Sequence, residues 1–90
     1  MSVRARMEAK LTAALSPLRL EIEDDSARHA GHGGAPAGGE SHFSVRIVAE
    51  AFAGKTRVER QRMVYSVLAE ELAGPVHALA LTAQTPAEAA

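Results

Sequence analysis

The stretch TRVERQRMVYSVLAEELAGPVHALALT, residues 56–82, restricts the fold of this chain more than any other. An amphipathic helical pattern fills its first two thirds, and a short apolar run fills the remainder. Gly74 and Pro75 separate the two parts, because glycine accepts the left-handed conformation at a helix end and proline cannot continue the helical hydrogen-bond ladder. The pattern therefore predicts a long helix over residues 57–73 and a buried strand over residues 76–82.

The predicted long helix has an apolar face and a charged face, as expected of a helix that packs one side on a core. The apolar stripe consists of Val58, Gln61, Tyr65, Leu68 and Leu72, widened by Val64 and Val67. The charged face carries Glu59, Arg60, Arg62, Glu70 and Glu71. His77 is the second residue of the strand that follows, so we expect the rest of the chain to pack around this unit or to face His77.

One helix and two strands are predicted before this unit. Apolar spacings of three and four predict a helix over residues 3–15, which Ser16-Pro17 ends. Period-two alternation predicts strands over residues 18–24 and 42–48, which should pair as a wide antiparallel hairpin. The expected inward residues are Met7, Leu11, Ala14 and Leu15 in the helix, Leu18, Leu20 and Ile22 in the first strand, and Phe43, Val45 and Ile47 in the second.

The predicted element order is α-β-β-α-β. Three strands with two helices on one face make a two-layer α+β sandwich, and 90 residues allow a single domain, residues 1–90. Phe52 is expected to fill the core and Gly54 to make a turn before the long helix. The position of the last strand stays open; parallel pairing beside the first strand would require a right-handed crossover through the long helix.

Composition excludes several kinds of chemistry. The chain has no cysteine, which excludes a disulfide, a thiolate nucleophile and an all-thiolate metal site. This is compatible with a reducing cytoplasm, where we expect the protein to be. The start, MSVRARMEAKLTAAL, has charges within its apolar spacing and resembles neither a signal peptide nor a membrane span. A net charge of −1 gives little overall attraction to nucleic acid.

Residues 25–41, DSARHAGHGGAPAGGES, are predicted to be a flexible loop that contains five of the seven glycines. A loop of this length in a compact domain is commonly functional or disordered. The segment lacks the Lys-Ser/Thr pair of a phosphate-binding P-loop, and no helix is predicted after it. Residues 84–90 are expected to be a frayed tail.

Histidine is the strongest site-forming residue in the sequence. His29 and His32 lie in the predicted loop, while His42 and His77 open the second and third strands. A single histidine near a strand end is more often structural or simply exposed, but imidazole also binds zinc, copper and iron. A closed zinc site needs four protein ligands, so these histidines are better interpreted as half of a metal site that a partner completes.

An enzyme is disfavoured, because the sequence contains no nucleophile elbow, HExxH or dinucleotide-binding fingerprint. Asp24 and Asp25 are the one candidate acid–base pair. Neighbouring residues of an extended segment point to opposite sides, so a solvated turn is the favoured interpretation of these two carboxylates.

A basic run at the start of the long helix provides an alternative site. It consists of Lys55, Arg57, Arg60 and Arg62. Such a run could hold a nucleic-acid phosphate backbone, although a solvated helix face is the plainer interpretation. The sequence provides no evident aromatic platform on which bases would stack.

Four segments in order resemble the BolA family. They are LEIEDDSARHAGH, GESHFSVRIV, F-x-G-K-x-x-V-x-R-x-R-M-V-Y, and LAEEL-x-G-P-V-H-A-L-A-L followed by TP. The likeness covers about residues 5–88, nearly the whole chain. It implies an α-β-β-α-β fold similar to the class II KH domain, in agreement with the element order above.

The resemblance also implies a function. BolA-like proteins pair with monothiol CGFS-type glutaredoxins and share a 2Fe-2S cluster with them, through a His or Cys in the loop after the first strand and a His at the start of the last strand. In this sequence the implied ligands are His77 and His29, with His32 as the alternative to His29. The partner's cysteine and glutathione would supply the thiolates, and no cofactor is expected in the isolated chain.

Family members are also described as transcriptional regulators that bind DNA through the basic helix region. This chain has Gln61 where the family usually has the histidine of an Arg-His-Arg triplet, which removes the imidazole from that position. Two hypotheses follow: a non-enzymatic adaptor in iron–sulfur cluster trafficking or iron sensing that forms a heterodimer with a glutaredoxin, and a DNA-binding regulator. A small interaction domain with inert histidines, and a weak homodimer of the free chain, are the remaining alternatives.

Overall fold

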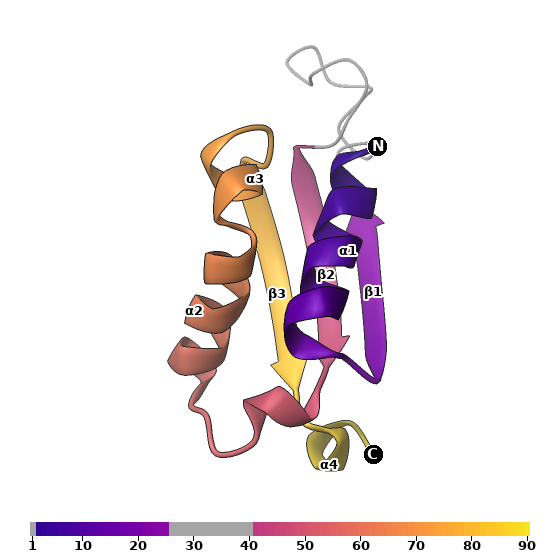
Figure 1. Ribbon diagram of the computed structural model, residues 1–90, viewed down its shortest axis with the longest axis vertical. Coiled ribbons are helices and arrows are strands. Elements are labelled where there is room, and N and C mark those ends of the chain that lie inside the picture. The colour runs from indigo at the N-terminus through magenta and orange to yellow at the C-terminus, as the bar shows by residue number, and fades with distance from the viewer. Residues whose placement is uncertain (1, 26–40) are drawn as a thin grey trace.

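The computed structural model describes residues 2–25 and 41–90, and it confirms the α+β architecture. The elements in chain order are α1 (Val3–Leu15), β1 (Arg19–Asp24), β2 (His42–Val48), the 3-10 helix η2 (Glu50–Phe52), α2 (Arg57–Val67), α3 (Ala69–Ala73), β3 (Ala78–Gln84) and α4 (Pro86–Ala89). The strands form one sheet, and α1, α2 and α3 lie on the same side of it (Figure 1). Within the described ranges, no helix has the length and apolar character needed to cross a bilayer.

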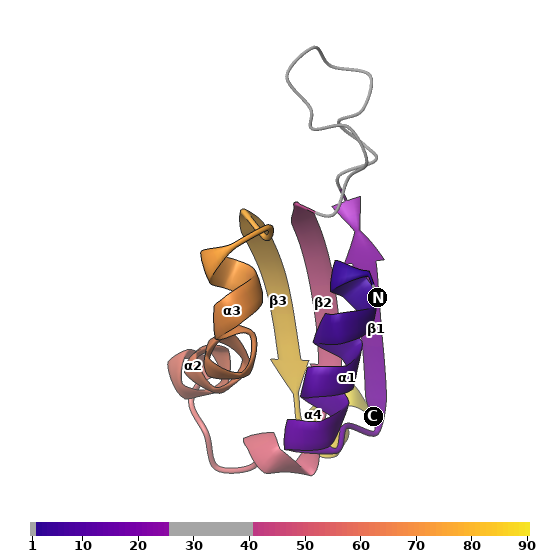
Figure 2. The same ribbon diagram turned by 45° about the horizontal axis from the view of Figure 1, so that its top comes forward.

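The sheet has the order β1-β2-β3, which settles the strand position that the sequence left open. The predicted antiparallel hairpin of β1 and β2 is confirmed. β3 pairs parallel with β2 rather than with β1, so α2 and α3 form the crossover between two neighbouring parallel strands. β3 is therefore an edge strand of this sheet, and α2, seen nearly end-on in Figure 2, lies toward the side of β3 away from β2.

Most of the predicted core residues are buried. Phe43, Val45 and Ile47 face the helices from β2, and Phe52 closes the core from η2, as expected. Met7 and Leu11 of α1 are also fully buried. Two predictions are wrong: Ala14 is exposed, and Leu18 is 69% exposed because β1 begins one residue later and Leu18 lies in the turn after α1.

The predicted single helix over residues 57–73 is two helices that meet at Leu68. The φ of −100° and ψ of 20° at Leu68 depart from helical geometry, although its N–H still donates to the Val64 carbonyl at 3.0 Å. The buried stripe runs through Val64 and Leu68, whereas Val58 is 54% exposed and Gln61 is also exposed. The predicted apolar stripe was therefore centred on a face of the helix that is turned partly toward solvent.

Glu71 is a further correction, because it lies inside the protein and not on the solvated face of the helix. Its side chain is 2% exposed. Lys10 Nζ of α1 donates to both carboxylate oxygens at 2.8 and 3.1 Å, and Arg6 Nε lies 3.8 Å from Oε2. This ion pair joins α1 to α3 across the helical layer.

The end of the chain also differs from the expected frayed tail. Pro86–Ala89 form α4, and Thr85 and Glu88 make reciprocal capping hydrogen bonds at its start. Glu88 also pairs with Arg60 of α2 at 2.6 Å, so α4 is held against the rest of the domain.

Candidate metal-ligating site at the loop end of the sheet

His77 lies directly before β3, because the strand begins at Ala78 and not at the predicted Val76. The Val76 N–H donates to the Glu71 carbonyl at 2.9 Å, so Val76 still belongs to the turn after α3, and its side chain is 2% exposed. The buried Val76 before it and strand β3 after it hold the His77 backbone in place. The His77 side chain is exposed.

The start of β2 contacts the His77 backbone. The Ser41 carbonyl accepts hydrogen bonds from the N–H groups of His77 at 2.7 Å and Ala78 at 3.2 Å. Ser41 Oγ also lies 2.9 Å from Nδ1 of His42, and the rings of His42 and His77 lie 6.4 Å apart between centroids. The sequence did not predict this histidine pair; parallel pairing of β3 with β2 would have indicated it.

The segment between β1 and β2 leaves and re-enters the sheet at this same end. β1 ends at Asp24 and β2 begins at His42, beside the start of β3 (Figure 1). Ser44 Oγ donates to the carboxylate of Asp25 there, so one of the two candidate carboxylates contacts β2. The predicted ligands His29 and His32, and most of the predicted loop over residues 25–41, lie outside the described residues.

Among the described residues, the donor set at this end does not make a complete metal site. Within residues 2–25 and 41–90, no three His, Cys, Asp or Glu side chains come close enough together to hold a metal ion. His77 offers an imidazole, which suits iron, copper and zinc, and its ring is accessible from outside. The arrangement can contribute a ligand to a shared metal centre.

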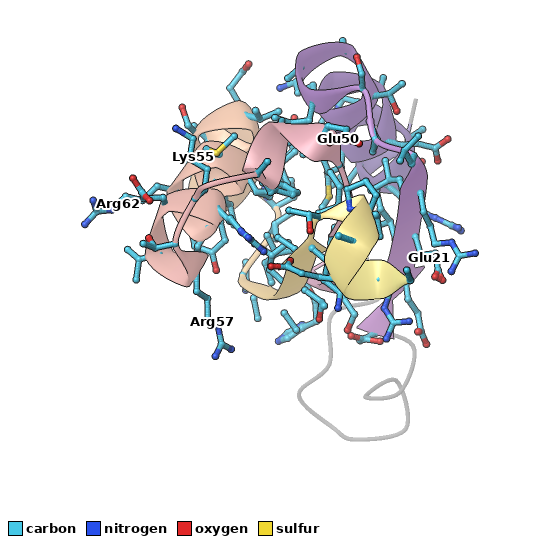
Figure 3. All side chains as sticks on the ribbon, turned by 90° about the horizontal axis from the view of Figure 1, so that it is seen from below. Glu21, Glu50, Lys55, Arg57 and Arg62 are labelled. Atoms are coloured by element: carbon cyan, nitrogen blue, oxygen red, sulfur yellow. The ribbon has the colours of Figure 1, made fainter. Side chains whose placement is uncertain are left out.

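The predicted basic site lies at the other end of the molecule, where α2 begins (Figure 3). Arg60 is only 13% exposed, and Glu88 accepts from its guanidinium at 2.6 and 3.0 Å. Arg60 also donates to the backbone carbonyls of Lys55 and Ala83. The Arg60 hydrogen bonds lower the pKa of Glu88 to about 2, with a backbone hydrogen bond at Thr85 as the next cause. Arg60 is therefore a structural residue in this protein.

The remaining basic residues line two neighbouring depressions. Arg57 and Arg62 project from α2 in different directions (Figure 3). Lys55 and Arg57 line the groove between α2 and β3, whereas Arg62 lines a shallow depression beside Val58 and Tyr65.

Together, the fold and the histidines define a small α+β domain that presents an exposed imidazole at the end of a mixed sheet. Residues 11–88 match the family model described as BolA-like protein. The chain therefore belongs to the BolA-like family, which confirms the resemblance seen in the sequence.

Known relatives agree with this assignment. The chain is 51% identical over 85 residues to the DNA-binding transcriptional regulator BolA of Escherichia coli, covering 94% of this chain and 77% of that protein. It is 50% identical over 86 residues to BolA-like protein 1 of Mus musculus, covering 96% of this chain and 60% of that protein. The solved BolA domain of SufE1 from Arabidopsis thaliana is similar with a TM-score of 0.83 at 46% identity, covering 98% of each chain.

Some relatives are much longer than this chain. SufE-like protein 1 of Arabidopsis thaliana is 48% identical over 87 residues, which cover 92% of this chain but 24% of that protein. The chain thus spans less than two thirds of the length of the mouse and Arabidopsis proteins it matches.

Proposed function

We propose that this chain is a non-enzymatic adaptor in iron–sulfur cluster trafficking or iron sensing, which acts in the cytoplasm as a heterodimer with a monothiol glutaredoxin. His77 contributes one imidazole to a shared 2Fe-2S cluster. A histidine of the segment between β1 and β2, His29 or the alternative His32, contributes the second. The cysteine of the glutaredoxin and glutathione supply the thiolates.

The observation that carries this proposal is the placement of His77. Its side chain is exposed at the end of the sheet where β1 ends and β2 begins, and two backbone hydrogen bonds of the Ser41 carbonyl hold the chain there. Replacing thiolates by imidazoles raises the reduction potential of an iron–sulfur centre, and protonation competes for an imidazole ligand, so such a centre suits transfer or sensing.

The test is co-expression with a monothiol glutaredoxin, followed by visible absorption and circular dichroism of the purified pair. We expect His77→Ala to abolish the signature of mixed His/thiolate ligation. His42→Ala is the matched control, because it removes an imidazole 6.4 Å away on the neighbouring strand and should leave the signature in place. Since His77 is exposed, far-ultraviolet circular dichroism should show an intact fold. Unchanged visible spectra in the His77 variant would contradict the proposal.

The same complex compares the two histidines of the segment between β1 and β2. His29→Ala should weaken the mixed-ligand signature more than His32→Ala does. The reverse order would make His32 the second ligand and leave the role of His77 unchanged.

A second candidate function is DNA binding, which the name of the Escherichia coli relative suggests for that protein. In this chain, Lys55, Arg57 and Arg62 are exposed cations at the start of α2. Arg60 is engaged with Glu88, so a phosphate-binding role falls to the other three.

A further inference from the structure

β3 has one edge that no strand of residues 2–25 and 41–90 covers. Ala78 donates to Ser41 of the β2 side at 3.2 Å, and the Gln84 carbonyl accepts from Ala49 at 3.0 Å. Successive residues of a parallel strand direct their backbone groups to opposite edges, so even-numbered residues of β3 bond to β2. The backbone groups of Leu79, Leu81 and Ala83 therefore face outward, toward α2.

Two side chains of α2 occupy part of this edge. Tyr65 Oη lies 3.5 Å from the Leu79 carbonyl, and Arg60 Nη1 donates to the Ala83 carbonyl at 3.2 Å. By the same alternation, the Leu81 carbonyl and the N–H groups of Leu79, Leu81 and Ala83 lie on the edge of β3 that faces away from β2. The centre of the strand thus keeps donors and an acceptor for another backbone.

A groove of about 630 Å³ lies along this edge, with α2 as its other wall. Figure 1 shows α2 on the side of β3 away from β2. The volume of the groove is within the range of small-ligand and short-peptide sites. Leu79 and Leu81 line one wall, and Gln61 and Tyr65 line the other.

The groove carries excess positive charge at the end where α2 begins. Lys55, Arg57 and Arg60 line it, and Glu88 is the acidic residue among its lining side chains. Glu88 is paired with Arg60, and the Glu59 carboxylate, with which the charge of Lys55 interacts, does not line the groove. The lining therefore offers no second carboxylate to the exposed cations Lys55 and Arg57. An occupant with carboxylates near this end would complement them.

From these observations we infer that the groove between α2 and β3 receives an extended acidic peptide segment of a partner protein, which adds to the sheet as a fourth strand. Leu81 is the central backbone contact, and Lys55 and Arg57 bind the carboxylates of the segment. Strand addition obtains its affinity from main-chain hydrogen bonds and its specificity from side-chain contacts. The inference does not depend on the cluster proposal, because His77 lies at the opposite end of β3 from these cations.

The test begins with a phage-displayed library of linear peptides selected against the full chain, and the most enriched peptide is then made synthetically. We expect acidic peptides that slow the exchange of the Leu81 amide and shift the amide resonances of Leu79 and Ala83. N-methylation of alternate peptide residues is the decisive step. One set of alternate positions faces β3 and should abolish binding, whereas the other set faces away and should leave it within about threefold.

Charge variants provide the second arm. Arg57→Glu should weaken binding of the peptide at least about tenfold, whereas Arg4→Glu, the same charge change on an exposed residue of α1, should leave it unchanged. The inference would be overturned by selection of no acidic peptide, by binding that is insensitive to both N-methylated sets, or by protection of Leu81 in a homodimer of the free chain. An oligonucleotide that binds more tightly than the peptide and displaces it from the groove would assign the groove to nucleic acid. That result would also overturn the inference.

Discussion

At the scale of single residues, the buried carboxylate of Glu71 shows how charge is accommodated in a small core. Burial raises the pKa of Glu71, but the hydrogen bonds from Lys10, a backbone hydrogen bond and the charges of Lys10 and Arg6 outweigh burial. The pKa of Glu71 therefore lies below its ordinary value, and the hydrogen bonds to Glu71 and Glu70 raise the pKa of Lys10. The two groups stay ionised together.

The Glu71 pair predicts an asymmetric mutational response. Lys10→Met leaves a nearly inaccessible carboxylate without its main donor, so we expect Tm to fall by about 5–15 °C. Lys10→Met combined with Glu71→Leu removes both charges and should recover most of that loss, because replacing a buried pair by apolar side chains is often neutral. Thermal unfolding followed by circular dichroism measures both. If the double variant is as unstable as the single one, the fall in Tm does not come from a Glu71 carboxylate left without Lys10.

Ser16 provides a second residue-scale prediction, because it has a φ of 45° at the end of α1. Glycine adopts this left-handed conformation without steric cost, so Ser16→Gly should increase the free energy of unfolding by about 0.5–1 kcal/mol. The same exchange at the exposed Ser66 inside α2 is the control, and it should decrease stability by about 0.5 kcal/mol. Urea unfolding of both variants tests the signs, and equal signs would contradict the explanation.

At the scale of elements, the strands were predicted better than the long helix. Period-two alternation marked β1 and β2 because one face of each is buried, and their antiparallel pairing followed. The break at Leu68 could not be predicted, since no Gly or Pro marks it and the residue keeps its bond to Val64. The start of β3 was placed two residues early, because the apolar Val76 is buried in a turn rather than in the sheet.

The sequence predicted where His77 lies in the fold but not the residues around it, and its role as a metal ligand stays a prediction. An exposed His77 near the ends of β1 and β2 was expected, and it is observed. The proximity of His42 depends on which strand β3 joins, and the sequence did not decide this. The use of Arg60 as a structural residue depends on Glu88, which belongs to a segment expected to fray.

The contact of α4 with α2 predicts a dependence on acid. The pKa of Glu88 is lowered from 4.5 to about 2, so its stabilising effect is complete above the ordinary value and is lost as the pH falls from about 4.5 to about 2. We expect the Ala89 amide, which donates to the Thr85 carbonyl at 3.1 Å, to lose exchange protection over this range. Glu88→Gln should remove the transition, and an identical transition in that variant would assign it to another group.

At the scale of the whole molecule, the candidate metal-ligating site and the basic start of α2 lie at opposite ends of the domain (Figure 1). Each end can be altered separately, because no residue is shared between them.

This separation predicts independent responses. Arg57→Glu with Arg62→Glu should abolish binding to duplex DNA and its dependence on salt, while the spectra of the glutaredoxin complex stay unchanged. His77→Ala should abolish the cluster signature and leave binding to duplex DNA unchanged. Electrophoretic mobility shifts at several salt concentrations, measured beside the visible spectra, test both. Loss of the cluster signature in the charge-reversed variant would show that the ends are coupled, and unaltered DNA binding would remove the second candidate function.

The Ser41 carbonyl has a mechanical consequence for recognition. It accepts from the backbone of both His77 and Ala78, and it stands where the chain re-enters the sheet. Any displacement of Ser41 would therefore disturb the backbone position of His77, the residue that carries the exposed ring.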